Sequence, residues 1–371
     1  MGMLTSGFVV AKAAQPSTAT AGTVKPRPIT ASQPVYTLRW MPSTAYTRGQ
    51  QVVNPNNDVV SANLGHTSSA TYASDVTKWT ISSTFATALV NGAAPVRQGD
   101  LSLNVKNYGV KGDGITDDTA AIQAVLAAVP AKGAAVFFPA GNYLVPNGGL
   151  TCESTVTLTG VPGLDGTGSR IITTATNTTA LTLDGAASVV SGLSFIHTTT
   201  GTRSAGLVGL SITNSNFTRV EKCFFQGWST CLQMISGIYY TVTDNSFRAF
   251  VVAGLDISSP VNTDSGDMSI TCNSFDRGSD TATGGSAVLW RSGGGLRFTS
   301  NKINGGVGAC AFADGVRLSV ADGATTGILL VNNNSIENFS ARGIAVEKAG
   351  TTGVFGLGIL VAGNEIATYG A

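Results

Sequence analysis

An asparagine followed two positions later by phenylalanine or isoleucine recurs through the second half of the chain. The asparagines are Asn245, Asn273, Asn301, Asn334 and Asn364, and the apolar residues are Phe247, Phe275, Ile303, Ile336 and Ile366. Their intervals of 28, 28, 33 and 30 residues match one coil of a solenoid, in which each coil repeats the inward positions of the coil below. Asparagine tolerates left-handed backbone angles, and its amide can bond to the asparagine one coil away. The repeat predicts stacked β-coils joined by an asparagine ladder with a structural role.

A second short apolar strand lies between successive asparagine turns. Its copies are Gly254–Ile257, Ala287–Trp290, Gly315–Leu318 and Gly343–Val346. Successive side chains of a strand point to opposite faces, so the apolar neighbours of Asp256 and Arg317 face the interior and these two residues face solvent. Coils lie about 4.8 Å apart, so outward residues of neighbouring coils form a continuous strip. The residues expected on this strip are Asp256, Trp290, Arg291, Arg317 and Glu347.

A single helical pattern precedes the repeats. Three glycines between residues 109 and 114 supply a permissive turn, and Asp117 or Asp118 can cap a helix through its carboxylate. Apolar residues then recur at helical spacing: Ile122, Val125, Leu126 and Val129. Pro130 ends the element. The pattern predicts one short amphipathic helix at about residues 117–129, followed by strands at 135–138 and 143–145.

The remaining chain divides by composition. Residues 1–34 are rich in Ala, Thr, Ser and Pro, a composition typical of an extended arm. Residues 35–83 alternate short strands with paired aromatics, which predicts a small β module. Residues 84–102 carry turn signals without periodicity and are expected to be a linker. The solenoid is expected to occupy residues 103–371.

Composition and charge exclude several classes of protein. With 43% hydrophobic residues, 12% charged residues and 46 glycines, the chain is too apolar for disorder and favours short strands with tight turns. A net charge of +1 gives no basic face for nucleic acid or an anionic membrane. No apolar run approaches the roughly 20 residues of a membrane span. The cysteines lack CxxC spacing, and turn formation and capping explain Asp113, Asp117 and Asp118, so neither a metal nor another cofactor is expected.

The segment from Asn104 to Val145 contains the string NYGVKGDGITDDTAAIQAVLAA and, further on, VFFPAGNYLV. It resembles the opening signature of the pectate-lyase-like β-helix superfamily, which is common at the start of tailspikes and polysaccharide-degrading solenoids. The resemblance implies a right-handed parallel β-helix whose first coil is plugged by the helix. The expected fold class is therefore all-β: a single-stranded right-handed parallel β-helix with a capping α-helix, preceded by an extended arm and a small β module.

The small module has a resemblance of its own. Trp40, the run Ser43–Tyr46, Gly49, Val52 and Lys78–Trp79 are similar to the recurrent pattern of chitin-binding-like β modules. In that family exposed aromatics stack on sugar rings, which the resemblance extends to Trp40, Tyr46 and Trp79. The alternative is that these aromatics form the core of a module too small to have another one.

Candidate catalytic carboxylates lie in the middle coils: Asp264, Asp267, Asp276 and Asp280. Glycoside hydrolysis needs two carboxylates about 5–9.5 Å apart, which adjacent coils can provide. Residues 260–264 faintly resemble the N-T-D signature of polygalacturonases, but that family's Asp-Asp pair after glycine, Gly-His-Gly and Arg-x-Lys motifs are missing. A lyase would need a base together with Ca²⁺ or Arg to neutralise a uronate, and no acidic cluster suggests one. Catalysis stays unassigned, and an enzyme here would be a polysaccharide depolymerase, either a glycoside hydrolase or a lyase.

The expected strip suits a sugar polymer, because Trp stacks on sugar rings and Arg pairs with acidic sugars; the alternative is an ordinary solvated face. The order of parts resembles that of phage tailspikes. We expect a virion protein that binds other tail or baseplate proteins through its N-terminal region and host cell-surface polysaccharide through a homotrimeric β-helix. The alternative is a secreted, extracellular bacterial polysaccharide lyase or hydrolase with an accessory module. No basic residue precedes the apolar stretch at residues 4–10, so this stretch is not expected to act as a secretion signal. No recognisable cap follows Asn364, so trimerisation, another virion protein or further chain is expected to cover the last coil.

Overall fold

The computed structural model describes residues 38–39, 41–48, 51–53, 59–83, 102–163, 167–185, 187–198, 203–258, 268–276, 285–291, 294–306, 312–320, 322–323, 325–356 and 358–367. The chain forms two compact units, Met1–Asn91 and Gly92–Ala371. The expected arm, and the expected linker apart from Ser102, lie outside the described residues. Within the described ranges, no helix has the length and apolar character to cross a membrane.

The N-terminal unit contains a small β module. Its strands are β1 (Leu38–Arg39), β2 (Ala45–Tyr46), β3 (Gln51–Val53), β4 (Val59–Ala62), β5 (His66–Thr67) and β6 (Trp79–Ser83), with the 3₁₀ helix η1 (Tyr72–Lys78) before β6. One sheet has the order β1-β3-β4-β6, and β2 pairs with β5. The Asp75 carboxylate is fully buried and accepts hydrogen bonds from the Ser69 N–H at 2.6 Å and the Lys78 ammonium at 2.8 Å. Asp75 thus ties η1 to the loop before it.

The solenoid begins with a cap formed by η2 (Val105–Tyr108), β8 (Asp113–Asp117) and α2 (Thr119–Ala127). The predicted helix is confirmed, and its buried apolar residues join the solenoid core. Asp117 accepts a hydrogen bond from the Thr119 N–H at 2.9 Å, as a residue at a helix start does. The alternative, a cap by the Asp118 carboxylate, is wrong. Asp118 instead accepts from the N–H groups of Lys111 and Gly112 at 2.6 and 2.7 Å and holds the glycine turn against the helix start.

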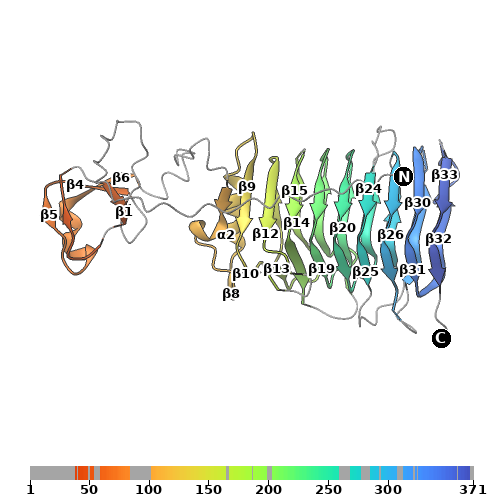
Figure 1. The fold of residues 1–371 in the computed structure, drawn as a ribbon, viewed down its shortest axis with the longest axis horizontal. Coiled ribbons are helices and arrows are strands. Elements are labelled where there is room, and N and C mark those ends of the chain that lie inside the picture. The colour runs from red at the N-terminus through yellow and green to blue at the C-terminus, as the bar shows by residue number, and fades with distance from the viewer. Residues whose placement is uncertain are drawn as a thin grey trace, which may run out of the picture. The chain divides into compact units, whose positions relative to one another are not determined.

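Three long parallel sheets form the walls of the solenoid, and each regular coil adds one strand to each sheet (Figure 1). Sheet 1 contains β7 (Ser102–Asn104), β9 (Ala134–Phe138), β12 (Val156–Gly160), β15 (Val189–Ser191), β18 (Arg219–Glu221), β21 (Thr241–Thr243), β24 (Met268–Thr271), β27 (Leu296–Thr299), β30 (Ile328–Asn332) and β33 (Gly358–Ala362). Sheet 2 contains β8, β10 (Gly141–Leu144), β13 (Ser169–Thr173), β16 (Leu193–His197), β19 (Phe224–Gln226), β22 (Ser246–Arg248), β25 (Ser274–Asp276), β28 (Lys302–Asn304), β31 (Ser335–Glu337) and β34 (Glu365–Ala367). Sheet 3 contains β11 (Leu150–Cys152), β14 (Thr179–Asp184), β17 (Val208–Thr213), β20 (Thr230–Ile235), β23 (Ala253–Ser258), β26 (Ser286–Trp290), β29 (Phe312–Val320) and β32 (Phe339–Lys348). The predicted right-handed parallel β-helix is confirmed.

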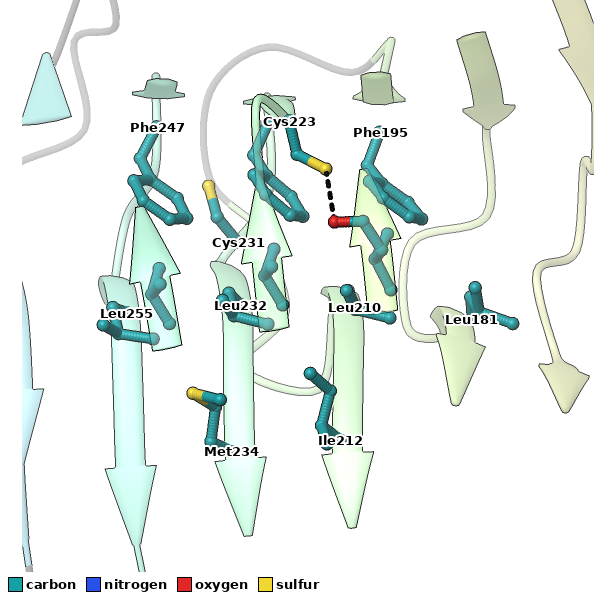
Figure 2. Close-up of a cluster of buried hydrophobic side chains, with 14 of the residues drawn as sticks. Leu181, Phe195, Leu210, Ile212, Cys223, Cys231, Leu232, Met234, Phe247 and Leu255 are labelled. Carbon is teal, nitrogen blue, oxygen red and sulfur yellow. Dashed lines mark hydrogen bonds between the residues drawn. The ribbon is translucent and has the colours of Figure 1, made fainter. Parts of the chain in front are cut away.

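A single column of side chains runs through the lumen along sheet 2. Its members are Phe195, Phe225, Phe247, Phe275, Ile303 and Ile336, all fully buried and in register from coil to coil. The phenylalanine rings stack with centroids 4.7 to 5.1 Å apart. Figure 2 shows leucines of sheet 3 in the same cluster: Leu181, Leu210, Leu232 and Leu255. The predicted single hydrophobic lumen is confirmed.

The asparagine ladder lies at the turn between sheets 1 and 2. Each side-chain oxygen from Asn273 to Asn364 accepts the backbone N–H of the asparagine one coil earlier at 2.9 to 3.0 Å. The predicted ladder is confirmed, but the left-handed backbone belongs to the residue before each asparagine. These residues are Asp244, Cys272, Ser300, Asn333 and Gly363. The asparagines are therefore selected for their amides, and the turn angles are adopted one position earlier.

Candidate functional site

The C-terminal half of sheet 3 carries a group of charged side chains on its outer side. Its strands β23, β26, β29 and β32 pair in parallel, and the register aligns Asp256 with Leu289, Arg317 and Ala345. Asp256 and Arg317 thus occupy one outward row on coils that are two apart, as the alternation of apolar residues predicted, but Asp256 does not face solvent as expected, because its side chain is only 8% exposed. The structure brings Arg291 and Glu347 next to this row through ion pairs.

Trp290 does not lie on this outer face, and the outward orientation expected for it is wrong. It aligns with Ile257 and Leu318 in an inward row, and its side chain is completely buried in the lumen. The register of the sequence repeats is confirmed, because it already aligned Trp290 with the inward residues Ile257 and Leu318; the outward expectation for Trp290 contradicted that alignment. A buried indole cannot stack on a sugar, so the outer face has no aromatic contribution from Trp290.

Two ion pairs link expected strip residues on different coils. Arg291 contacts Asp256 through two hydrogen bonds, with Nε–Oδ1 at 3.0 Å and Nη2–Oδ2 at 3.3 Å. Arg317 donates from Nε to Glu347 Oε1 at 2.6 Å. The paired residues are 35 and 30 positions apart in sequence, so each pair bridges neighbouring coils. The side chains therefore hold one another in place across the strands.

Asp314 and Arg342 extend this group and were missed by sequence analysis. Arg342 donates from Nε and Nη2 to the two carboxylate oxygens of Asp314 at 2.8 and 3.0 Å, and from Nη1 to Glu347 at 3.0 Å. Arg317 Nε lies 4.0 Å from Asp314. A signal was present, because Asp314 and Arg342 each directly precede the repeated glycine of their strand, which places them one coil apart. We call the six residues Asp256, Arg291, Asp314, Arg317, Arg342 and Glu347 the charged strip.

The electrostatics of the charged strip favour the ionised forms of Glu347 and Arg342. Hydrogen bonding from Arg317, and in smaller part from Arg342, outweighs desolvation and holds the pKa of Glu347 below its usual value. Hydrogen bonds to Asp314 and Glu347 raise the pKa of Arg342. Three cations and three anions balance, so the strip has no net charge. It is a set of fixed, oriented hydrogen-bonding groups and not a region of one sign.

The arginines of the charged strip remain accessible while they are paired. The side chains of Arg291, Arg317 and Arg342 are 48%, 42% and 47% exposed. A guanidinium has five N–H donors, and a bidentate carboxylate takes two of them. The remaining donors suit hydroxyl, carbonyl or carboxylate oxygens of a ligand that lies across the coils. The arrangement is chemically suited to binding.

Of the candidate catalytic carboxylates, the structure describes Asp276 alone, and it lies in sheet 2, away from the strands of the charged strip. Asp276 ends β25 in sheet 2, where the register places Arg248 and Asn304 on either side of it, so no second carboxylate is its direct neighbour in that row. Asp264, Asp267 and Asp280 lie outside the described residues. Among the residues that the structure describes, no group of three or more His, Cys, Asp or Glu side chains could hold a metal ion.

The aromatics expected to bind sugar in the small module pack inside it. Tyr46 and Trp79 are 4% and 6% exposed and meet edge to face with ring centroids 5.0 Å apart. Both belong to the core cluster of the module, and the Tyr46 hydroxyl accepts a hydrogen bond from the Met41 N–H at 2.6 Å. The structure thus supports the alternative of a module core for these two residues, as expected where so few apolar residues are present. Trp40 lies outside the described residues.

Comparison with known proteins shows which family the first coils of the solenoid are similar to. Residues 102–231 match the family described as rhamnogalacturonase A/epimerase, pectate lyase-like, so the resemblance noted for residues 104–145 is confirmed. A 59-residue segment is 46% identical to mannuronan C5-epimerase AlgE5 of Azotobacter vinelandii, over 16% of this chain and 6% of that protein. A 49-residue segment is 53% identical to alginate lyase 7 of the same organism, over 13% of this chain and 6% of the relative. The chain thus matches only a small part of these relatives.

Solved structures show the same fold. A DFA-IIIase mutant from Arthrobacter chlorophenolicus A6 superposes with a TM-score of 0.52 at 16% identity, over 72% of this chain and 68% of that one. At this identity the likeness extends to the fold alone. The phiAB6 tailspike, solved with oligosaccharides of the Acinetobacter baumannii surface polysaccharide, matches at 18% identity and a TM-score of 0.48 over 90% of this chain and 60% of that one.

Proposed function

We propose that this protein is a phage tail spike or tail fibre protein that recognises host cell-surface polysaccharide. In this proposal a homotrimeric β-helix presents the charged strip to the glycan, and the N-terminal region attaches to other tail or baseplate proteins of the virion. The observation that carries the proposal is the set of three half-exposed arginines fixed on one outer face by carboxylates of neighbouring coils.

A polysaccharide fits this surface better than other polymers do. The charged strip is balanced in charge, which gives no attraction for the highly charged backbone of nucleic acid. It spans four coils, from Asp256 on β23 to Glu347 on β32, with a rise of about 4.8 Å per coil. An extended, hydroxyl-rich chain can accept a hydrogen bond from a guanidinium at each successive coil. Hydrogen bonds to charged groups are also stronger than neutral ones.

The architecture supports the same assignment. A pectate-lyase-like solenoid preceded by a small β module, with the arm expected from composition before it, is the order of parts expected for a tailspike, and the pectate-lyase-like match covers the first coils. The curated relatives with short matching segments are named for action on mannuronan and alginate, which are polysaccharides. The location proposed for the protein is therefore the virion.

The proposal is tested by combining oligomer mass with glycan binding. Light scattering on the purified full chain should give a trimer, and a panel of capsular and lipopolysaccharide O-chains should contain at least one ligand. Arg317→Ala should weaken that binding about tenfold, the loss of roughly one charged hydrogen-bonded contact. Arg297→Ala removes an exposed arginine of β27 in sheet 1 and serves as the matched control. A stable monomer, or equal binding by both variants, would contradict the proposal.

A second candidate is a polysaccharide-modifying enzyme, which the matching segments of mannuronan epimerases and alginate lyase favour. It predicts turnover of a polyuronate by the purified chain. Incubation with alginate, followed by reducing-end and unsaturated-uronate assays, separates the two functions. A new absorbance from unsaturated sugar would identify a lyase, and new reducing ends without it would identify a hydrolase. A change in the mannuronate-to-guluronate ratio without either product would identify an epimerase, and binding without any of these changes supports a recognition protein.

A further inference from the structure

Two exposed aromatic rings lie on the outside of the solenoid, away from the charged strip. Phe217 and Tyr239 are 63% and 46% exposed, and they are the aromatic members among the exposed large apolar side chains of the described residues. Their rings stack nearly parallel, with centroids 5.0 Å apart and planes inclined by 10°. Burying such rings in a lumen is favourable, whereas leaving them in water is not, so their location needs a reason.

The backbone at both residues is in the left-handed region. Phe217 has φ of 59° and Tyr239 has φ of 58°, angles that are uncommon for bulky residues and cost of order 1 kcal/mol or more. Glycine or asparagine would adopt them with less strain. Two successive coils thus keep an aromatic residue at a turn position that disfavours it. Left-handed angles recur at the turns of this solenoid, as at Ala187 and Asp244, so the feature that needs an explanation is the aromatic side chain and not the angle.

The turn that carries the rings is held rigidly. The Phe217 N–H donates to the Ile238 carbonyl at 2.9 Å, and the Ile238 N–H donates to Asn216 Oδ1 at 3.1 Å. Below them, the fully buried hydroxyls of Ser215 and Thr218 are bonded at 2.6 Å. Rings on such a turn lose little freedom when a ligand binds, which is the condition for an efficient stacking platform.

The preceding coil leaves space on the free face of Phe217. Ala187 has φ of 58° and occupies the same turn position, because it stands two residues before Val189, which pairs with Arg219 as Arg219 pairs with Thr241. Ala187 is exposed and contributes only a methyl group. The aromatic stack therefore ends at Phe217. At the turn of the preceding coil, where a third ring would lie, the side chain is only the exposed methyl group of Ala187.

Polar groups border that layer. Asp184 and Asn214 are the residues three positions before Ala187 and Phe217, and the Asn214 amide donates to Asp184 Oδ1 at 3.1 Å. Both are on the surface of the turn, where a carboxylate and an amide can bond hydroxyl groups. An apolar face beside hydroxyl-binding groups is the chemistry of a sugar ring, which has one face of C–H groups and a rim of hydroxyls.

We propose that a pyranose ring binds above Ala187 and stacks on the open face of Phe217, with Asp184 and Asn214 bonding its hydroxyls. This is a second sugar subsite at the turn between sheets 3 and 1. It rests on the proposed polysaccharide recognition and adds a contact distinct from the charged strip. The ligand is one uncharged or weakly charged sugar residue of the polysaccharide, since the subsite contains no cation among the residues named.

The subsite is tested with two opposite changes. Phe217→Ala removes the platform, and Ala187→Phe extends the aromatic stack into the layer where the sugar lies. Each should weaken binding of the polysaccharide identified in the panel by about tenfold, a loss of the size expected for one stacked contact. Ile115→Ala removes an exposed apolar side chain of β8 and should leave binding unchanged. All three sites are exposed, so each variant should remain folded, and binding is compared at a temperature well below the unfolding transition of each variant.

The outcomes separate this subsite from the broader function. If Phe217→Ala binds as the wild type while Arg317→Ala does not, the charged strip stands and the subsite is overturned. If Ala187→Phe binds more tightly, the layer above Ala187 is not the sugar position, and that also overturns the proposal. If Phe217→Ala changes the mass found by light scattering, the rings belong to a subunit contact. If the wild type binds no polysaccharide, both proposals fail together.

Discussion

Removing one rung from the middle of the asparagine ladder should destabilise the solenoid far more than removing the last rung. The side chain of Asn301 is 2% exposed and makes contacts in both directions. Its oxygen accepts from the Asn273 N–H and amide, both at 3.0 Å, and its amide donates to Ile270 O at 3.0 Å and to Asn334 Oδ1 at 3.1 Å. Asn301→Ala removes all of these at once.

The size of the effect follows from the groups left behind. In Asn301→Ala the Asn273 N–H loses its acceptor in a place that water does not reach, and a buried unsatisfied group costs about 1–3 kcal/mol. The cavity left by the amide adds to this cost. We expect a loss of about 3 kcal/mol, or a fall in Tm of about 6–12 °C for a unit of this size. Asn364→Ala, at the half-buried end of the ladder, should cost about 1 kcal/mol, because water can replace its contacts.

Thermal unfolding of both variants measures the difference, and hydrogen exchange locates it. In Asn301→Ala the backbone N–H of Asn273 loses its acceptor and should exchange faster. The backbone N–H of Asn334 keeps its acceptor in Asn364, so its exchange rate should not change. Equal Tm values for the two variants, or unchanged protection at Asn273, would refute the assignment of stability to the internal rungs.

Three further predictions concern the cap, the charged strip and the small module. Gly112→Val should lower Tm without changing binding in a polysaccharide assay, because Gly112 has φ of 58° and an added Cβ would lie 2.7 Å from the ring of Tyr143; unchanged melting would count against it. Arg342→Ala should lower the midpoint of urea unfolding, since it leaves the buried Asp314 with only the distant Arg317, whereas an unchanged midpoint would mark the pair as incidental. Desolvation by burial acts to raise the pKa of Asp75, but hydrogen bonds from Lys78 and Ser69 outweigh it and lower this pKa from 3.8 to about 2. The ionised Asp75 therefore stabilises the folded module above pH 4, and this contribution is lost as the pH falls toward 2. Asp75→Asn should flatten that acid transition in near-ultraviolet circular dichroism, and an unchanged transition would exclude Asp75 as its cause.

The parts of the fold that sequence predicted are those fixed by repetition. The pair formed by Asn273 and Phe275 has a counterpart in each neighbouring coil, in the same short turn. The distance in sequence from one pair to the next therefore gives the length of a coil and fixes the register of its strands. The helix before the first coil was predictable for a similar reason, because its apolar positions, its capping acid and its terminating proline agree. Local and long-range requirements coincide at these positions.

The candidate site was harder to predict because it depends on which side chains of neighbouring coils meet on the outer face. Successive residues of a strand face opposite sides, and Trp290 was expected on the outer face although the repeats aligned it with the inward Ile257. Asp314 and Arg342 were overlooked because each is unremarkable alone and becomes significant only as one of a pair on adjacent coils. Phe217 shows no periodicity, since its turn position holds Ala187 one coil earlier.

The two consecutive coils that run from Asn245 to Asn301 have equal length, and their strands pair with the strands of the coil before and the coil after. A stretch of 28 residues is therefore a unit that an in-frame duplication can copy, with its own rung and its own core ring supplied ready-made. Such an event would lengthen the surface by about 4.8 Å and add one more place for a ligand contact, without a new kind of packing. If the protein binds host surface polysaccharide as proposed, a duplication of this kind would be a single genetic step to a longer binding surface.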